Sequence, residues 1–378
     1  MSVRSPWAHV AEAAAALAGA MGVGRFVYTP ILPLMTAQAG LTPQAGANLA
    51  TANYVGYLVG ALAGTLAPGL ARSRTVNHYS LLLLVATLAA MPLTHSTTVW
   101  LVLRLLTGVA SAIVFVVAAN SLLSHLSGPH LHGWGFSGVG VGIALSGLLV
   151  LVVRSVGDWQ AAWWAAATLA AVFSAGAWNL RPEQSPSTSD ELHSRTHRWF
   201  SALFASYALE GVGYIIAGTF LVAAIDQGSP GWIGSGTWVI VGLAAVPSAV
   251  LWARLGRHWS HPDLLLVALV VQAVGIALPA LAGGVVAALI AAFLFGGTFI
   301  GISTIALAIG SHLGFPRSVA LLTAGYSVGQ TLGPLAVTPL LRNGYHQALV
   351  VAAVVVLMAA TAAAVLRIRF PHHLLASL

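Results

Sequence analysis

Long apolar stretches separated by short polar breaks run along almost the whole chain. An α-helix needs roughly 20 apolar residues to cross a hydrocarbon core of about 30 Å, and the stretches reach that length repeatedly. Twelve transmembrane helices are therefore predicted, over residues 9–35, 45–70, 76–94, 98–122, 133–154, 159–180, 199–224, 234–253, 263–282, 285–310, 317–341 and 346–368. This pattern indicates an all-α membrane protein.

The longest polar break separates six of these spans from the other six. It holds three acidic residues, three arginines and several Ser and Pro residues. A faint internal repeat agrees with this division, because Gly22-Val-Gly-Arg25 in the first span matches Gly211-Val-Gly-Tyr214 in the seventh. Duplicated halves around a midplane site are a known transporter plan. We therefore predict two pseudo-symmetric six-helix bundles, over residues 1–180 and 199–378, joined by a cytoplasmic linker over 181–198.

The composition excludes most other classes of protein. Charged residues make up 6% of the chain, whereas a soluble domain has about 25%, so its surface suits a lipid bilayer. The absence of cysteine excludes disulfides, cysteine-based zinc sites and thiol catalysis. No phosphate-binding loop, dinucleotide fingerprint or Ser/His/Asp arrangement occurs, and the histidines lie in loops or at span ends. We expect no enzyme activity, no cofactor and no metal site.

The arginines predict the orientation of the chain in the membrane. All fifteen basic residues are Arg. With the N-terminus inside, the inside loops and tails hold eleven of them, whereas the outside loops hold Arg154 and Arg342. Positive residues favour the cytoplasmic side, so a multi-pass protein of the cell inner membrane with both termini in the cytoplasm is predicted. The arginines form no basic face, so we expect no nucleic-acid partner. We also expect the protein to be a monomer in the lipid bilayer.

Several motifs resemble those of a known transporter superfamily. They are GVGRFVYTPILP over 22–33, ANYVGYLVG over 52–60, GYSVGQTLGP over 325–334 and Arg104-Leu-Leu-Thr-Gly108. The chain is similar to the major facilitator superfamily, in its YbfB/YjiJ-like branch, over nearly its whole length. The resemblance implies secondary transport, and for Arg104 it implies proton coupling through a nearby carboxylate. The superfamily's loop Asp is replaced by Pro68 and, in the second half, by Ala253, so the charge relay assigned to that Asp cannot be carried over.

Four ionisable residues of the predicted spans are candidates for transport chemistry, because a charge costs at least about 2.5 kcal/mol at the helix centre. They are Glu12, Arg25, Arg104 and Glu210. Glu12 lies near the cytoplasmic end of its span and can reach water. Glu210 is the carboxylate nearest the middle of a span and could load and release a proton, although a structural role is the alternative. For Arg104 the alternative is a set of hydrogen bonds that ties helices together.

Arg25 is the strongest candidate for substrate binding. It follows two glycines and precedes Pro30 and Pro33, so the first helix is predicted to be irregular there. Freed backbone groups and a guanidinium near the midplane would suit an anionic or polyhydroxylated substrate. The alternative is an Arg that holds helices together through carbonyls or through Glu210.

Polar and aromatic residues on shared helix faces are candidate walls of the same pocket. Their spacings of three, four or seven residues bring them onto one face of each helix. The candidates for substrate binding, besides Arg25, are Asn53, Tyr57, Tyr207, Tyr214, Tyr326 and Gln330. Plain packing is the alternative for each of them. The glycine stripes at residues 56, 60 and 64, and at 325, 329 and 333, predict close helix–helix approach instead.

Together these features predict a secondary active transporter. It would move a small polar or anionic organic solute by alternating access, coupled to protons. Efflux of drug-like apolar compounds is one alternative, and a non-transporting membrane sensor or structural subunit is another.

Overall fold

The computed structural model describes residues 6–125, 129–180, 196–228, 231–315, 318–368 and 370. Throughout these residues the regular structure is helical. The first half of the chain forms α1 (Pro6–Leu17), the π-helical η1 (Ala18–Val23), α2 (Tyr28–Gln38), α3 (Pro43–Leu66), α4 (Pro68–Ala71), α5 (Arg74–Ala90), η2 (Met91–Leu93), α6 (Thr97–His125), α7 (Pro129–Val156) and α8 (Trp159–Gly176). The second half forms α9 (His197–Gly228), α10 (Trp232–Leu255), α11 (His261–Leu281), α12 (Val285–His312), α13 (Ser318–Val337), η4 (Thr338–Asn343) and α14 (His346–Arg367).

The helices confirm the predicted fold class. Each predicted span coincides with one long helix or, in the first span, with the run α1–η1–α2. Among the described residues, nine helical segments are long and apolar enough to cross a membrane by themselves. The three remaining long helices, α3, α8 and α13, carry more polar, small or Trp residues. These three helices pack against the more apolar ones and make up the rest of the twelve predicted spans.

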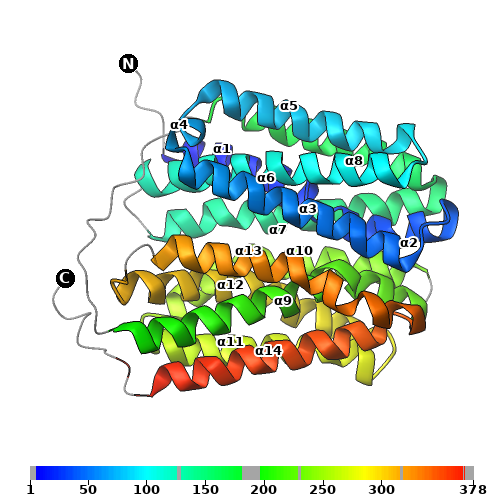
Figure 1. Ribbon diagram of the computed structural model, residues 1–378. Coiled ribbons are helices and arrows are strands. Elements are labelled where there is room, and N and C mark those ends of the chain that lie inside the picture. Colours follow the sequence, from blue (N-terminus) through cyan, green and yellow to red (C-terminus); the bar gives the residue numbers. More distant parts are fainter. Residues whose placement is uncertain are drawn as a thin grey trace.

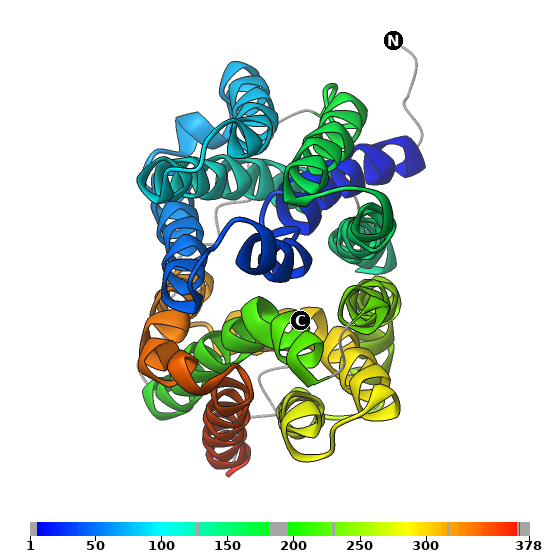
Figure 2. The ribbon, with the colours of Figure 1, turned by 90° about the vertical axis from the view of Figure 1, so that its right-hand side faces the viewer.

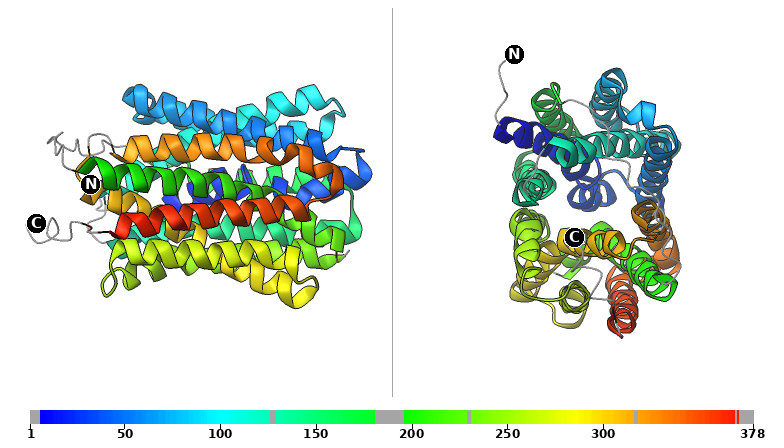
Figure 3. Two further views of the ribbon diagram at one scale, coloured as in Figure 1. Left: turned by 60° about the horizontal axis from the view of Figure 1, so that its bottom comes forward. Right: turned by 90° about the vertical axis from the view of Figure 1, so that its left-hand side faces the viewer.

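The long helices run side by side in two groups. Figure 1 shows the first half above the second, and α1 begins at the same end of the molecule at which α14 ends. We call this end the terminal side and the other end the opposite side. The end-on views in Figures 2 and 3 show the same two groups from the opposite and the terminal side. The halves meet chiefly through α7 with α10, α3 with α13, and α2 with α9.

The predicted linker falls mostly outside the described residues. Residues 181–195 are not described, and α9 already begins at His197. The bounds of the linker and of the two predicted domains therefore stay predictions.

The first span is broken as the Gly and Pro residues predict. Gly24 donates its backbone N–H to the carbonyl of Gly19 at 2.8 Å, a five-residue step that widens the helix into a π turn. A turn over residues 24–27 follows, and α2 begins at Tyr28 with Pro33 inside it. Because this break interrupts the regular hydrogen-bond ladder, it frees carbonyl groups at the depth of Arg25.

Glycines let the helices approach to backbone contact. A Cβ on Gly56 would overlap the carbonyl of Leu105 in α6, and a Cβ on Gly108 would overlap the carbonyl of Asn53 in α3. Between the halves, a Cβ on Gly140 of α7 would lie 2.6 Å from the backbone nitrogen of Val246 in α10. The glycine at 56 therefore packs as its stripe predicts, and the α7–α10 seam brings the two halves together along its length.

Candidate functional site

Arg25 lies where the two halves meet, and 3% of it is exposed. Its guanidinium carbon lies 4.3 Å from the ring centre of Tyr57, 5.0 Å from that of Tyr54 and 5.4 Å from that of Phe26. One of its Nη atoms donates a hydrogen bond to Oε1 of Gln330 in α13, which is 305 residues away in the sequence. A cation from the first half therefore binds an amide from the second.

The charge of Arg25 has no counter-ion among the described residues. No carboxylate there forms an ion pair with it, and its Nε has no hydrogen-bond partner. A buried charge that is not paired costs several kcal/mol, and each cation–π contact offsets only about 0.5–2 kcal/mol of that. The site therefore presents a cation that lacks an anion, and the partner is not Glu210, the alternative that charge alone suggested.

A stack of aromatic rings extends from this cation into the second half. Tyr214 of α9 stacks on Phe299 at 5.4 Å and on Phe295 at 5.8 Å between ring centres. Tyr326 of α13 stacks on Tyr207 at 4.4 Å and on Tyr214 at 6.0 Å. The structure thus brings three of the predicted pocket residues, Tyr207, Tyr214 and Tyr326, into one cluster.

Glu210 lies on α9, as Tyr207 and Tyr214 do, and is fully buried. Its Oε1 accepts a hydrogen bond of 3.3 Å from Nε2 of Gln272 in α11. Within the described part of the chain, Oε2 of Glu210 and Oε1 of Gln272 have no hydrogen-bond partner. Tyr214 and Tyr326 both interact electrostatically with Glu210 and with Arg25. The two tyrosines are therefore near enough to the buried carboxyl and to the buried guanidinium to interact with both.

Arg104 and Asn53 hold helices together. Arg104 donates hydrogen bonds to the carbonyls of Gly24 at 3.1 Å and Arg25 at 3.2 Å, the groups that the broken first span frees. Nδ2 of Asn53 donates to the carbonyl of Arg104 at 3.0 Å. This geometry matches the structural alternative for Arg104. Its coupling role and the substrate role of Asn53 stay predictions.

Sequence reasoning missed four residues of this region. The hydroxyl groups of Tyr54 and Thr219 share a hydrogen bond of 2.8 Å between the two halves. Tyr54 could have been predicted, because its spacing of three residues from Tyr57 puts both on one face of α3. Gln272 is the one amide in an otherwise apolar predicted span, which was also a usable signal. Phe26 and Trp238 gave no signal, because aromatic residues are common throughout the spans.

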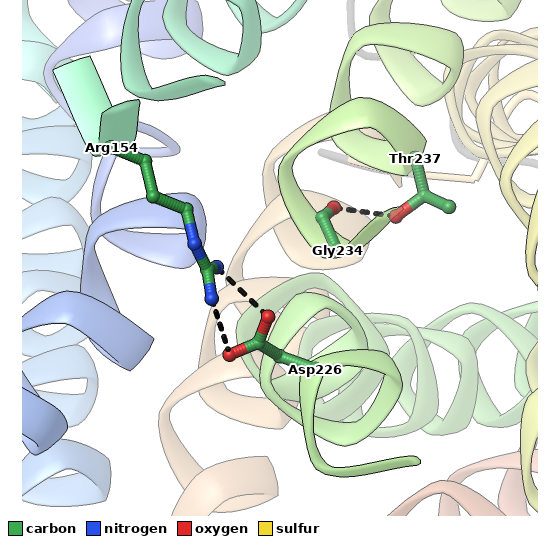
Figure 4. Close-up of polar contacts among 4 residues, drawn as sticks. All are labelled: Arg154, Asp226, Gly234 and Thr237. Carbon is green, nitrogen blue, oxygen red and sulfur yellow. Dashed lines mark hydrogen bonds and ion pairs between the residues drawn. The ribbon is translucent and has the colours of Figure 1, made fainter. Parts of the chain in front are cut away.

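On the opposite side, polar contacts join the two halves. Figure 4 shows Arg154 at the end of α7 facing both carboxylate oxygens of Asp226 in α9, at 2.8 and 3.3 Å. Near this pair, within α10, the hydroxyl of Thr237 donates a hydrogen bond to the carbonyl of Gly234. Deeper in the molecule, Thr29 donates to the carbonyl of Gly218 at 2.5 Å. The halves are therefore in direct contact on the opposite side.

Comparison with known proteins identifies the family. The sequence model of the family described as "Uncharacterised MFS-type transporter YbfB" matches residues 17–364. No curated protein sequence matches the chain significantly. Among solved structures, a mutant of the nucleoside transporter NupG is similar, with a TM-score of 0.72 and 11% identity over 95% of this chain and 99% of that one. At that identity the likeness shows the fold alone.

Proposed function

Since the chain belongs to the family of YbfB-type transporters in the major facilitator superfamily, a family of secondary transporters, we propose that it moves a small anionic organic solute by alternating access, coupled to protons. The protein lies in the cell inner membrane with its terminal side in the cytoplasm. The observation that carries the proposal is the buried, unpaired charge of Arg25 between the halves.

Arg25 supports an anionic substrate for two reasons. Its guanidinium remains charged at any physiological pH, so the missing anion must come from elsewhere. Its present partner Gln330 supplies one neutral oxygen. A substrate carboxylate or phosphate can displace that oxygen, because a negatively charged acceptor binds a guanidinium more strongly than a neutral one does. Because Arg25 and Gln330 belong to different halves, a substrate held between them responds to the relative movement of the halves.

Glu210 supports proton coupling. Its carboxyl has one described hydrogen bond, from an uncharged amide, and no cation pairs with it. Such a group can gain or lose a proton when water reaches it from one side and then from the other. Tyr326 interacts electrostatically with Glu210 and is one helical turn from Gln330, so α13 lies near both the proposed proton site and the proposed substrate site.

The contacts on the opposite side support a movement of the two halves. In the described state Arg154 and Asp226 hold α7 and α9 together. A pathway to the opposite side requires that this pair separate while the α7–α10 seam acts as the pivot.

Substrate identification and one conservative variant test the proposal. Metabolite profiles of a deletion strain would nominate anions, whose accumulation is then measured with purified protein in liposomes under a pH gradient. Arg25→Lys keeps the charge but loses the guanidinium fork, so the substrate affinity should fall by about tenfold or more. Arg342→Lys, at an exposed arginine on the opposite side, is the matched control and should bind as the wild type does.

Unchanged affinity in Arg25→Lys would contradict the proposal and move the pocket to Tyr57, Tyr326 and Gln330. Efflux of drug-like apolar compounds predicts a different result. In that case, Arg25→Gln would leave transport of the apolar compound intact.

A further inference from the structure

We propose that the substrate is a single planar ring that carries one anionic group, such as an aromatic or heteroaromatic monocarboxylate. The ring would lie in the crevice beside Phe26, Tyr214, Trp238 and Phe299, and the anionic group would bind Arg25. This inference rests on the proposed transport function and names the substrate class of the same site.

The crevice is lined by Phe26, the residue that follows Arg25, and its walls are mainly aromatic. Its lining residues are Phe26, Ile143, Tyr214, Gly218, Trp238, Val241, Phe295 and Phe299. The guanidinium of Arg25 lies 5.4 Å from the ring centre of Phe26, the wall residue that follows it in sequence. A ring in the crevice and an anion on Arg25 are therefore adjoining parts of one small molecule.

The shape of the crevice favours a flat ligand. Tyr214, Phe295 and Phe299 present nearly parallel rings, with interplanar angles of 17° to 22°. The rings pack so closely that no water molecule fits between them. The rings must therefore separate when a ligand enters, and a single flat ring requires the smallest separation.

Trp238 supplies a free hydrogen-bond donor in the wall. It is 1% exposed, and its Nε1 has no partner in the described part of the chain. A buried Trp N–H normally finds an acceptor, so this one is available to a ring heteroatom or a ring substituent. The site then offers one cation, one neutral donor and aromatic faces.

The same wall disfavours two other kinds of ligand. No carboxylate lines the crevice, so it provides no counter-ion for the ammonium group of a free amino acid. An uncharged ring would leave Arg25 without its anion. The combination of residues therefore selects for a negative charge and a ring in the same molecule.

Matched ligands test the ring and the charge separately. Binding of benzoate, cyclohexanecarboxylate, benzamide and phenylalanine to the purified full-length protein is measured by Trp fluorescence and by thermal stabilisation. Benzoate should bind at least about tenfold more tightly than cyclohexanecarboxylate, which has the same charge and a non-planar ring. Benzamide and phenylalanine should not bind. Trp238→Phe should remove the fluorescence change, whereas Trp259→Phe, at an exposed Trp on the terminal side, should keep it.

A variant of the wall provides the second comparison. Phe299→Leu should weaken benzoate by about tenfold and leave cyclohexanecarboxylate unchanged, because it removes a flat face and keeps the volume apolar. Equal affinity for both carboxylates, lost together in Arg25→Lys, would overturn the ring class and leave the proposed function standing. Binding of benzoate without any transport in liposomes would overturn the proposed function and leave the ring-binding site standing. Failure of both carboxylates to bind would overturn the ring class and leave the proposed function to the liposome assay with the identified anion.

Discussion

Neutralising Asp226 removes the ion pair that joins α7 to α9 on the opposite side. In the substitution Asp226→Asn the side chain keeps its shape, but Arg154 loses the two charge-assisted hydrogen bonds that it makes at 2.8 and 3.3 Å. If the pair holds the opposite side closed, its loss shifts the protein toward a state that is open on that side.

The expected size of the shift follows from the exposure of the pair. The side chains of Arg154 and Asp226 are 25% and 18% exposed, so solvent screens their attraction in part. An ion pair of this kind contributes about 1 kcal/mol, which corresponds to about a fivefold change in the population of the open state. High salt should produce part of the same shift in the wild type, because it screens the exposed side of the pair.

Cysteine labelling can measure this population, because the natural chain has no cysteine. Val150 is fully buried and lies one helical turn below Arg154 on the same face of α7. Val150→Cys should react slowly with an impermeant maleimide added from the opposite side. Adding Asp226→Asn should raise the labelling rate about fivefold if labelling follows opening.

A double-mutant cycle decides whether the pair itself is responsible. Arg154→Gln and the double variant should show the same increase as Asp226→Asn, since either change already breaks the pair. The charge swap Arg154→Asp with Asp226→Arg should restore slow labelling. Unchanged labelling in the single variants, or an additive increase of about 25-fold in the double variant, would refute the reasoning.

Three further predictions concern stability and topology. Arg104→Met should lower the Tm, because two carbonyls lose their hydrogen-bond donor at about 1–3 kcal/mol each. Arg25→Met should keep or raise the Tm, because it removes an unpaired buried charge. Differential scanning fluorimetry of the two variants measures both changes. Gly56→Leu should reduce the yield of folded protein in size-exclusion chromatography, because it overlaps Leu105, while Gly283→Leu, which meets no neighbour, should not. Cysteines introduced at Thr97 and Gln227 should react with an impermeant reagent in intact cells, whereas those at Ser73, Ser187 and Ser260 should react only after permeabilisation. Labelling of Ser187→Cys, in the linker, from the outside of intact cells would overturn the topology.

The sequence predicted the fold well because the bilayer sets the length of each helix. The first span was predicted over 9–35, and the helical run extends over Pro6–Gln38. Its break was expected from Gly22, Gly24 and the two prolines, since these residues disturb a helix wherever it lies. The π-helical form of the break was not predicted; within it, Gly22 packs against the backbone of Gly142 in α7, a contact that the sequence does not show.

The sequence singled out candidate residues for the site, but it could not predict their contacts. Arg25 and Gln330 both stood out as polar residues within apolar spans, yet their hydrogen bond depends on how the two halves dock. Charge suggested Glu210 as the partner of Arg25, whereas in the structure Arg25 binds Gln330 and Glu210 accepts a hydrogen bond from Gln272. Trp238 could not be recognised, because an unpartnered ring nitrogen is visible only in three dimensions.

Proton-driven accumulation by Glu210→Gln tests the central claim most directly. Gln has nearly the size of Glu and can still form hydrogen bonds, but it cannot gain or lose a proton. With the identified substrate in liposomes, counterflow exchange should continue at a rate near that of the wild type, while accumulation driven by a pH gradient should be lost. Accumulation at the wild-type rate would contradict proton coupling through Glu210 and leave that carboxyl a structural role.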